Sequence, residues 1–382
     1  MKPFTTQRIG ILGGGQLGKM LCQAGSRWGL NLSILDTDPH FPAGQVCPQF
    51  TTGSFRDEAD VLRFGKDMDV LTIEIEHVSV AALEHLQDQG VRVYPSPEVL
   101  RTIQDKGLQK LFYRDHQIPT SAFTLYDRSA EIRDAIRSGQ LSIPFVQKSR
   151  TAGYDGRGVA IIRQVEDLDK LLEGPSLTED LVPMQKEIAV VVARDIHGQC
   201  KAFPSVEMEF HEEANLVEFL ACPADLTDRQ EKEAEQLAIR VAEAFGTVGL
   251  LAVELFLTQE GTFLVNEVAP RPHNSGHHTI ECCETSQYEQ HLRAITGMPL
   301  GSTQLIRPGV MLNLLGEEGF SGPALYRGWE DCMAIPGVHV HVYGKAETRP
   351  FRKMGHVTVV ADTLEEARHR ARIVRETLNV IA

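Results

Sequence analysis

Two glutamates inside the most apolar part of the chain are the first candidates for chemistry. Residues 248–271 read VGLLAVELFLTQEGTFLVNEVAPR, two apolar runs around a polar turn. If Thr258 faces Phe263, antiparallel pairing places Glu254 directly opposite Glu267. Facing carboxylates repel each other unless one is protonated or a divalent cation lies between them. Because Mg²⁺ is commonly bound by two carboxylates together with substrate phosphates, we expect both glutamates to bind magnesium.

A glycine-rich loop offers a place for such phosphates. The stretch KSRTAGYDGRG, residues 148–158, has three glycines between two short β runs. Its backbone N–H groups could surround a triphosphate, with Lys148 before the loop and Arg157 within it. It lacks the G-K-[ST] ending and following helix of a Walker A motif, and glycines alone also suit a flexible hairpin tip. Combined with the glutamate pair, the loop favours phosphate binding.

Polar side chains gather in two further segments. PRPHNSGHH contains Arg271 and His273, which could bind a charged substrate or transfer a proton. Alternatively, Arg271 forms a structural ion pair with one of the hairpin glutamates. YGKAETRPFRKMGH brings Lys345 and Arg352 into a basic patch that suits either a phosphorylated substrate or a solvated loop. The histidine spacing does not match a helix-borne zinc motif.

The N-terminal stretch RIGILGGGQLGKML has the G-x-G-x-x-G pattern of dinucleotide-binding proteins. Its glycines follow an apolar run and precede a helical repeat, which predicts a strand, a tight turn and a helix. The next apolar run ends at Asp36, where such a unit places its ribose-binding acid. Glycines before a helix can bind any anion, so the pattern alone allows a nicotinamide or flavin enzyme or another phosphate-binding protein.

Composition limits the class of protein. The 382 residues suffice for two or three domains, and the formal net charge of −14 argues against binding to nucleic acid. Seven cysteines form no C-x-x-C pair, which suits a reducing compartment. There is no signal-peptide core, and the richest apolar run is too short for a bilayer and contains a glutamate. We therefore expect a cytoplasmic protein that does not bind membranes.

Three patterns along the chain predict three domains in an α/β fold. Residues 1–100 alternate apolar strands with helical stretches, which predicts a parallel sheet flanked by helices. One helix stopped by Pro119 leads into a second domain, residues 101–305. That domain contains a glycine-loop hairpin within a subdomain at about 125–190, and then a long helix and the apolar hairpin. Residues 306–382 predict a small β-rich domain with a final amphipathic helix.

Six motifs follow one another along the chain: GGGQLGKML, EIEHV, DKGLQK, GYDGRG, NEVAPRPHNSGHH and RPFRKMGH. In this order they resemble the N5-carboxyaminoimidazole ribonucleotide synthetases of purine biosynthesis, in the ATP-grasp superfamily, and NEVAPRPHNSGHH is the most specific of them. The resemblance covers nearly the whole chain. It implies an ATP-grasp fold with a Rossmann-like pre-ATP-grasp domain and a small β-rich C-terminal domain.

The resemblance also implies an activity. Family members use ATP and bicarbonate to make carboxyphosphate, then carboxylate 5-aminoimidazole ribonucleotide and release ADP and phosphate. Their cofactor set is ATP and Mg²⁺, without biotin or NAD. The resemblance also implies that the protein is a homodimer and that a mutase uses its product.

The same resemblance assigns roles to individual residues. The implied ATP-binding residues are Lys106, Lys148, Gly153, Tyr154, Asp155, Gly156, Arg157, Gly158, Val159, Glu179, Asp180, Leu181, Val182, Glu187, Asn266 and Glu267. Among them, residues 179–182 would contact adenine and Glu187 would accept hydrogen bonds from the ribose hydroxyls. The implied catalytic residues are Tyr154, Asp155, Arg157, Arg271, His273 and Lys345.

Substrate and metal contacts follow from the same comparison. The implied substrate-binding residues are Gly15, Gln16, Leu17, Glu76, Lys345 and Arg352. The implied magnesium ligands are Glu254 and Glu267, in agreement with the hairpin argument. The N-terminal glycine turn then contacts phosphate or substrate, no nicotinamide is required, and Asp36 is an ordinary acid at a strand end.

Some positions depart from the family pattern. Ala152 replaces a loop glycine, Ser149 replaces a common arginine, and Phe351 replaces the glycine of R-P-G-R-K. The last change affects the expected geometry around the following arginine. A histidine that some members use near the nucleotide is not identified, and Glu207 and His211 stay outside the prediction.

Four rival functions remain to be compared. A formate-dependent glycinamide ribonucleotide transformylase shares the fold and metal carboxylates but usually has G-E-L-G where this chain has G-Q-L-G. A biotin carboxylase subunit would be longer. A NAD-dependent oxidoreductase leaves the glutamate pair without a purpose. A nucleotide-binding regulator would bind ATP without turnover.

Overall fold

The computed structural model describes residues 2–151, 158–210 and 217–382. Its N-terminal part is a parallel five-stranded sheet in the order β3-β2-β1-β4-β5. The strands are β1 (Arg8–Leu12), β2 (Asn31–Asp36), β3 (Phe50–Thr52), β4 (Val70–Ile73) and β5 (Arg92–Tyr94), and the helices between them include α1 (Gln16–Ser26), α2 (Glu58–Gly65) and α3 (Val80–Asp88). Separate apolar clusters fill the two faces of the sheet, as expected for parallel strands covered on both sides. The predicted alternation of strands and helices is confirmed.

The segment that leads out of this sheet is two helices where the sequence pattern predicts one. They are α4 (Pro97–Ile103) and α5 (Lys106–Asp115). The Asp105 side chain accepts hydrogen bonds from the amides of Gly107 and Leu108, at 2.8 and 3.2 Å. An aspartate in this position starts a new helix, so the expectation of one continuous helix was wrong. The break places Lys106 in the first turn of α5.

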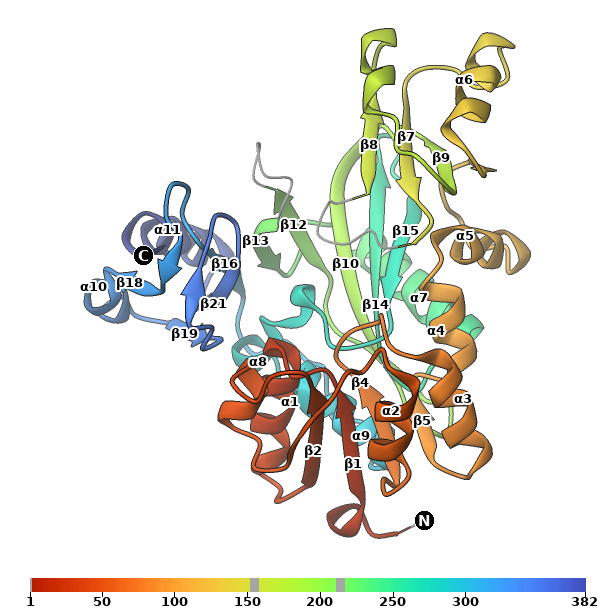
Figure 1. Cartoon of the computed structure of the whole chain (residues 1–382). Helices are drawn as coiled ribbons and strands as arrows, with labels where there is room; N and C mark the ends of the chain where they lie inside the picture. Colours follow the sequence, from red (N-terminus) through yellow and green to blue (C-terminus); the bar gives the residue numbers. More distant parts are fainter. Residues whose placement is uncertain (1, 152–157, 211–216) are drawn as a thin grey trace.

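A four-stranded sheet in the order β6-β9-β7-β8 carries the glycine-loop hairpin, at the top of Figure 1. Its strands are β6 (Phe123–Tyr126), β7 (Phe145–Ser149), β8 (Val159–Ile162) and β9 (Ser176–Asp180). Helix α6 (Ser129–Arg137) packs on it through the buried Ile132, and η3 (Val165–Lys170) follows β8. Strands β7 and β8 pair antiparallel with Lys148 opposite Val159, which confirms the predicted hairpin.

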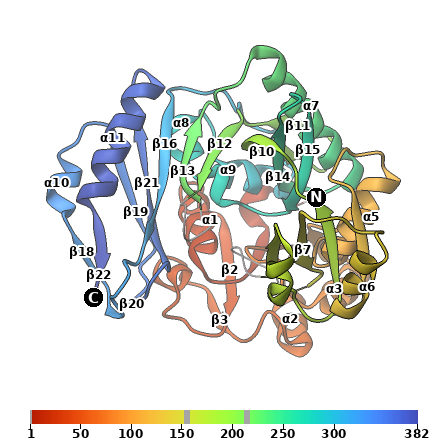
Figure 2. The ribbon, with the colours of Figure 1, turned by 90° about the horizontal axis from the view of Figure 1, so that it is seen from above.

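The largest sheet runs through the centre of the molecule in the order β15-β14-β10-β12-β13-β16-β21-β19, with β11 beside β10. Its strands are β10 (Met184–Arg194), β11 (Cys200–Ala202), β12 (Val206–Phe210), β13 (Val217–Cys222), β14 (Gly249–Thr258), β15 (Phe263–Ala269), β16 (Gly309–Leu315), β19 (Val338–Val342) and β21 (Lys353–Val360). Strand β13 pairs antiparallel with β16. The strands of the expected third domain therefore continue the central sheet (Figure 2).

Helices cover this sheet and connect it to the N-terminal part. The predicted long helix is α7 (Asp228–Phe245), which ends at Gly246 in the left-handed conformation. Helix α9 (Gln287–Thr296) contributes Tyr288, Leu292 and Ile295 to the same apolar cluster as α1 and β1. The remaining elements are η1 (Phe4–Thr6), η2 (Pro42–Gln45), η4 (Asn274–Gly276), α8 (Thr279–Cys282), β17 (Gly322–Pro323), β18 (Leu325–Arg327), α10 (Trp329–Met333), β20 (Glu347–Thr348), α11 (Leu364–Thr377) and β22 (Asn379–Ile381).

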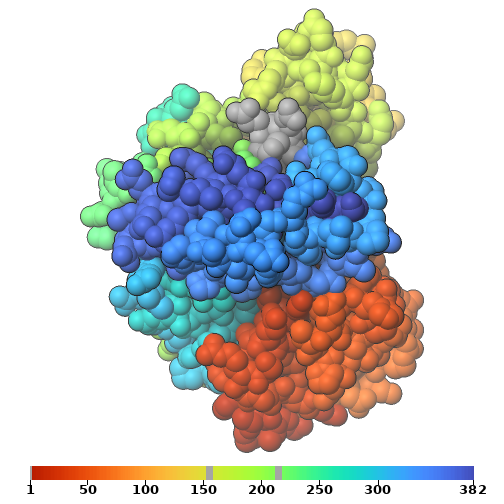
Figure 3. Space-filling view, turned by 90° about the vertical axis from the view of Figure 1, so that its left-hand side faces the viewer, coloured from red at the N-terminus to blue at the C-terminus, as the bar shows by residue number. Residues whose placement is uncertain are grey.

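The parts enclose the apolar hairpin of the central sheet. In Figure 1 the five-stranded sheet lies below β14 and β15 and the four-stranded sheet lies above them. Figure 3 shows the C-terminal residues, in blue, as a band between the N-terminal residues and the yellow-green residues of the upper sheet. Among the described residues, no helix combines the length and apolar character needed to cross a bilayer.

Candidate active site

The hairpin of β14 and β15 places Glu254 opposite Glu267, as the sequence predicts. The register near the turn is different, because Phe263 pairs with Leu257 and the expected pairing with Thr258 was wrong. A bulge between Val265 and Glu267 shifts the register by one residue and brings the two glutamates opposite each other. The extra residue in this bulge is Asn266, so the bulge also sets the position of that amide.

The two facing glutamates differ in their electrostatic surroundings. The ammonium group of Lys106, at the start of α5, forms an ion pair with Glu267 and lowers the pKa of that carboxyl group. Burial and the nearby Glu267 instead raise the pKa of Glu254. A divalent cation would relieve this repulsion, so the donor set fits magnesium once phosphate oxygens complete the coordination. Among the described residues, no group of three or more His, Cys, Asp or Glu side chains is arranged to hold a metal ion.

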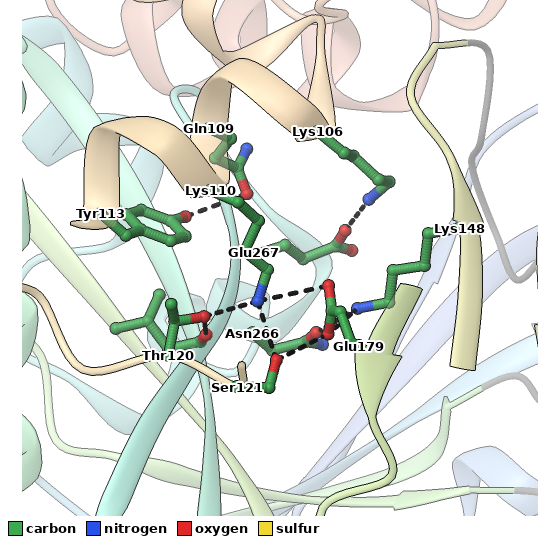
Figure 4. Close-up of polar contacts among 11 residues, drawn as sticks. Lys106, Gln109, Lys110, Tyr113, Thr120, Ser121, Lys148, Glu179, Asn266 and Glu267 are labelled. Carbon is green, nitrogen blue, oxygen red and sulfur yellow. Dashed lines mark hydrogen bonds and ion pairs between the residues drawn. The ribbon is translucent and has the colours of Figure 1, made fainter. Parts of the chain in front are cut away.

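Lys148, on β7 of the four-stranded sheet, contacts the hairpin of β14 and β15 (Figure 4). Its Nζ donates to Asn266 Oδ1 at 2.8 Å and to Glu179 Oε2 at 3.2 Å. Asn266 comes from β15, Glu179 from β9 and Lys148 from β7. Two sheets thus contribute to one polar cluster, in which three residues predicted to bind ATP contact one another.

Glu179 also contacts residues that the sequence analysis did not identify. Lys110 forms an ion pair with its Oε1 at 3.2 Å, and Ser121 Oγ donates to its Oε2 at 2.8 Å. Lys110 lies four residues after Lys106 on α5, a spacing that places both lysines on one face of the helix. The spacing was a usable signal for Lys110. The position of Ser121 depends on tertiary structure and has no comparable signal.

Other residues predicted to bind ATP surround this cluster. Glu187 lies on β10 opposite Phe256 of β14, and burial raises its pKa to about 7. Asp180 is the last residue of β9, and Leu181 and Val182 lie between β9 and β10. At the other end of the loop, Gly158 has a φ of +74°. Val159 begins β8 beside Lys148.

Glu76, one of the residues predicted to bind substrate, lies just after β4 of the N-terminal sheet. Its Oε1 forms an ion pair with Arg271 Nε at 2.7 Å. The ion pair seen for Arg271 is thus with Glu76 of the N-terminal part, whereas the sequence allowed one with a hairpin glutamate. His273 Nε2 lies 3.8 Å from Glu254 Oε1, and burial together with the charge of Arg271 lowers the pKa of His273 to about 3. His273 is thus a neutral side chain between the ion pair and the glutamates.

The N-terminal glycine turn is occupied by carboxylates of the chain itself. The amides of Gly15 and Gly18 each donate to Glu74 at 2.7 Å. The amide of Gly14 donates to Asp36 Oδ2 at 2.6 Å. The amide of Gly15 is therefore already bonded to Glu74 and is not available to the predicted substrate. Two further substrate predictions concern Gln16, which begins α1, and Leu17, whose side chain is buried in the core.

The two C-terminal residues predicted to bind substrate lie in the β20–β21 region. Lys345 Nζ donates to the carbonyl oxygen of Lys353 at 2.6 Å, and Arg352 Nη1 donates to that of Glu347 at 2.7 Å. Neither has a hydrogen bond or ion pair with the hairpin glutamates in the contacts described. The charge of Lys353 nevertheless acts on His273 by lowering its pKa. Lys353 of the basic segment therefore lies within electrostatic range of His273.

Several predicted residues have no structural test. Gly153, Tyr154, Asp155, Gly156 and Arg157, with the departure Ala152 and the candidate His211, lie outside the described residues. Of the other positions singled out, Glu207 forms an ion pair with Lys186 at 3.0 Å. Phe351 has a φ of +61°, the left-handed conformation that a glycine adopts readily. The substitution at Phe351 has therefore kept a glycine-like backbone.

The three sheets and the lysines and carboxylates between them define an ATP-grasp protein. An ATP-grasp domain model matches residues 111–288, and a ribonucleotide synthetase preATP-grasp domain model matches residues 6–104. A phosphoribosylaminoimidazole carboxylase C-terminal domain model matches residues 309–370. The chain belongs to the N5-carboxyaminoimidazole ribonucleotide synthetase family.

Individual relatives agree with this family. The N5-carboxyaminoimidazole ribonucleotide synthase of Bacillus subtilis is 36% identical over 94% of this chain and 92% of its own length. The synthetase structure from Thermotoga maritima superposes with a TM-score of 0.91 at 42% identity, covering 99% of this chain and 100% of that one. A structure from Aspergillus clavatus, described as a complex with ADP and 5-aminoimidazole ribonucleotide, has a TM-score of 0.89 at 32% identity, covering 98% of this chain and 99% of that one.

Some relatives are longer than this chain. It spans 66% of the length of the phosphoribosylaminoimidazole carboxylase of Vigna aconitifolia and 65% of that of Saccharomyces cerevisiae. The family favours a synthetase over the formate-dependent transformylase, the regulator and the oxidoreductase that the sequence left as rivals. The carboxylates in the glycine turn agree with this choice, because Glu74 lies where a dinucleotide phosphate would meet the amides.

Proposed function

We propose that this chain is an ATP-dependent ligase of purine biosynthesis that carboxylates 5-aminoimidazole ribonucleotide. Bicarbonate attacks the γ-phosphorus of ATP, which releases ADP and forms carboxyphosphate. The exocyclic amine of the ribonucleotide then forms a bond to the carboxyl carbon, phosphate leaves, and the amine loses a proton. The product is N5-carboxyaminoimidazole ribonucleotide. The observation that carries the proposal is the meeting of Glu254, Glu267, Lys106 and Lys148 at one junction, in a chain of this family.

The nucleotide side of the reaction uses the lysines and carboxylates of that junction. Lys106 and Lys148 face the phosphates and compensate the charge that develops on their oxygens. Glu187 accepts hydrogen bonds from the ribose hydroxyls, and residues 179–182 contact adenine. Gly153, Gly156, Gly158 and Val159 are assigned to the phosphates by the family pattern.

Magnesium is the metal we assign to the site. Glu254 and Glu267 would hold it, with Asn266 beside them on the bulge. When bound, magnesium supplies positive charge to the phosphate oxygens and offsets the repulsion between the two glutamates. The raised pKa of Glu254 supports this assignment, because a carboxyl group that resists ionisation alone is stabilised in its charged form by a cation.

The acceptor side of the reaction binds the ribonucleotide and bicarbonate. We assign Gln16, Glu76, Lys345 and Arg352 to the ribonucleotide, with Gly15 and Leu17 contributing through the same turn. Arg271 is oriented by its ion pair with Glu76, so its guanidinium group can hold an anionic oxygen. His273, neutral because of its low pKa, adds a hydrogen-bonding side chain without further positive charge. Tyr154, Asp155 and Arg157 are assigned to the catalytic set by the family pattern.

The wider setting is part of the same proposal. We assign the chain to the cytoplasm and to a homodimer, and its product to a mutase. The seven cysteines are free thiols, which agrees with a reducing compartment. We keep the three expected domains at residues 1–100, 101–305 and 306–382 as part of the proposal.

The first experiment measures ADP release by the purified chain with ATP, magnesium and bicarbonate, with and without 5-aminoimidazole ribonucleotide. We expect the ribonucleotide to raise ADP release and a carboxylated product to form. ATP consumption that ignores the ribonucleotide would contradict the proposed acceptor and retain the ATP-grasp chemistry. No ATP consumption under any condition would contradict the ligase.

A further inference from the structure

Lys110 is a buried lysine that the proposed reaction does not use directly. It lies on α5 and is only 2% exposed. Its Nζ donates hydrogen bonds to Thr120 Oγ1 and Ser121 Oγ, at 2.5 and 3.0 Å, and forms the ion pair with Glu179. The buried ammonium group thus has two hydroxyl acceptors and one carboxylate of opposite charge around it.

Glu179 lies between this buried lysine and the lysine that faces the nucleotide site. Its Oε1 meets Lys110, and its Oε2 meets both Ser121 and Lys148 (Figure 4). The side chain of Glu179 is 3% exposed and that of Lys148 is 11% exposed. The carboxylate therefore cannot rotate without losing a contact, and its orientation fixes one partner of Lys148.

We propose that Lys110 is a positioning residue for ATP: it holds Glu179, and Glu179 in turn holds the Lys148 ammonium beside Asn266. The inference rests on the proposed function, because it assigns Lys148 to the phosphates. Lys110 itself lies behind Glu179, on the side away from Lys148, and acts through that carboxylate. Lys110 on α5 thus orients Glu179 on β9, which in turn orients Lys148 on β7.

Stability alone does not explain a lysine at this position. Removing an ammonium group from water is costly, and well-packed apolar residues often replace buried ion pairs with little loss of stability. Burial lowers the pKa of Lys110 to about 8, although Glu179 acts in the opposite direction. Lys148 and Lys110 hold the pKa of Glu179 below its ordinary value against the effect of burial. Lys110, Lys148 and Glu179 therefore remain charged inside the protein at neutral pH.

The test is a double-mutant cycle on the full-length chain. Lys110→Met, Lys148→Met and the double variant are compared in their affinity for ATP, measured by calorimetry, and in their KM for the ribonucleotide substrate. We expect Lys110→Met to weaken ATP binding about tenfold or more and to change the KM for the ribonucleotide less than about twofold. In the Lys148→Met background, Lys110→Met should cause almost no further loss, because the effect passes through Lys148.

Tyr113→Phe is the matched control. Tyr113 is fully buried on the same helix, and its hydroxyl donates to Gln109 Oε1 at 2.9 Å, apart from Glu179. We expect this variant to retain its ATP affinity within about twofold even if it unfolds at lower urea concentration. Ser121→Ala is the second variant if Lys110→Met does not fold. It should weaken ATP binding, again only when Lys148 is present.

Each outcome decides between the alternatives. Unchanged ATP affinity in a folded Lys110→Met variant, or losses that add in the double variant, would overturn the positioning role and leave the ligase intact. An equal loss in Tyr113→Phe would assign the effect to helix packing and overturn the inference as well. Absence of ATP binding by the unmodified chain would contradict the proposed function itself and remove the basis of the inference.

Discussion

The N-terminal glycine turn and the central hairpin both bring carboxylates close to other polar groups, but they satisfy these charges differently. In the turn, the Glu74 carboxylate accepts amide hydrogen bonds of 2.7 Å from Gly15 and from Gly18. In the hairpin, Glu254 faces another glutamate, and the neutral His273 lies 3.8 Å from its carboxylate. The first carboxylate accepts two amide hydrogen bonds, although burial and the nearby Asp36 raise its pKa, whereas the second lies directly opposite another glutamate.

The difference shows why a sequence pattern for anion binding need not mark a ligand site. Amides at the start of a helix bind any anion, including a carboxylate of the same chain. In this protein Glu74 fills that position and stabilises the turn. The ligand chemistry is expected where repulsion remains to be relieved, at Glu254 and Glu267. Substitutions of the hairpin glutamates should therefore lower turnover, and substitutions in the N-terminal glycine turn should lower the free energy of unfolding.

Glu267→Gln should have the largest effect, on turnover. The amide removes the charge that pairs with Lys106 and that we assign to magnesium, so we expect kcat to fall by about a thousandfold or more. ADP release in the presence of the ribonucleotide measures it. Glu260→Gln, on the exposed turn of the same hairpin, is the control and should keep its activity. Normal turnover in Glu267→Gln would remove this glutamate from the metal site and break the comparison.

Gly13→Ala tests the glycine turn through stability. Gly13 has a φ of +107°, and an added Cβ would lie 2.4 Å from Glu74 Cγ. We expect the free energy of unfolding to fall by about 3 kcal/mol, from the strained backbone and the displaced carboxylate.

Gly29→Ala is the matched control for this change. Gly29 has a φ of +62°, and an added Cβ would have nothing within 4 Å. It should cost only about 1 kcal/mol, the strain of the left-handed conformation alone. Urea unfolding measures both variants. Equal losses would show that Glu74 does not determine the conformation of the turn.

The same two regions show how far sequence carries the structure. The strand, turn and helix around the glycines follow from local periodicity. The pairing of Glu254 with Glu267 was predicted from a turn register that is wrong by one residue, and the bulge at Asn266 offsets that error. The bulge at Asn266 does not follow, since one inserted residue leaves the apolar pattern almost unchanged. The pairing of β13 with β16 also joins segments far apart in sequence, and no periodicity reports such a contact.

The site shows the same limit. Lys148 could be identified from the glycine loop that follows it, whereas Lys106 was identified from the family motif DKGLQK, because the helix start beside it was not predicted. Ser121 could not, because its hydroxyl becomes relevant only when β9 brings Glu179 next to it. Lys110 is an intermediate case, with a helical spacing that indicates its face of α5 but not its partner.

His291→Gln tests the connection between the two regions and its dependence on pH. His291 Nε2 lies 2.9 Å from Thr72 Oγ1 of β4, and its Nδ1 accepts the amide of Leu250 of β14 at 3.3 Å. Burial lowers the pKa of His291 to about 3. Its contribution to stability is therefore present above pH 6.5, its pKa when unfolded, and is lost as pH falls toward 3.

At pH 7.5 we expect His291→Gln to lower the free energy of unfolding by about 1–2 kcal/mol through its lost hydrogen bonds. The difference from the unmodified chain should shrink as pH falls below 6.5 and reverse in sign before pH 4, because only the unmodified chain binds a proton at this position on unfolding, at a cost of about 1.4 kcal/mol per pH unit. Urea unfolding at several pH values measures this difference. The contributions of the other buried histidines cancel in the difference, because both proteins contain them. A constant difference would show that this histidine is not held neutral.

Phe351→Gly should have the smallest effect, and it completes the comparison of residues with positive φ. At Gly13 a side chain would meet Glu74, whereas Phe351 already has a left-handed backbone and is a residue 37% exposed to solvent. Glycine would remove about 1 kcal/mol of strain and return about half of it as greater freedom of the unfolded chain, so the variant should be more stable by about 0.5 kcal/mol. Urea unfolding measures the gain. The amide of Phe351 donates to the carbonyl oxygen of Gly316 at 2.8 Å, and glycine would keep this hydrogen bond. A loss of stability would therefore mean that packing of the Phe351 side chain outweighs the backbone strain and holds the turn before Arg352.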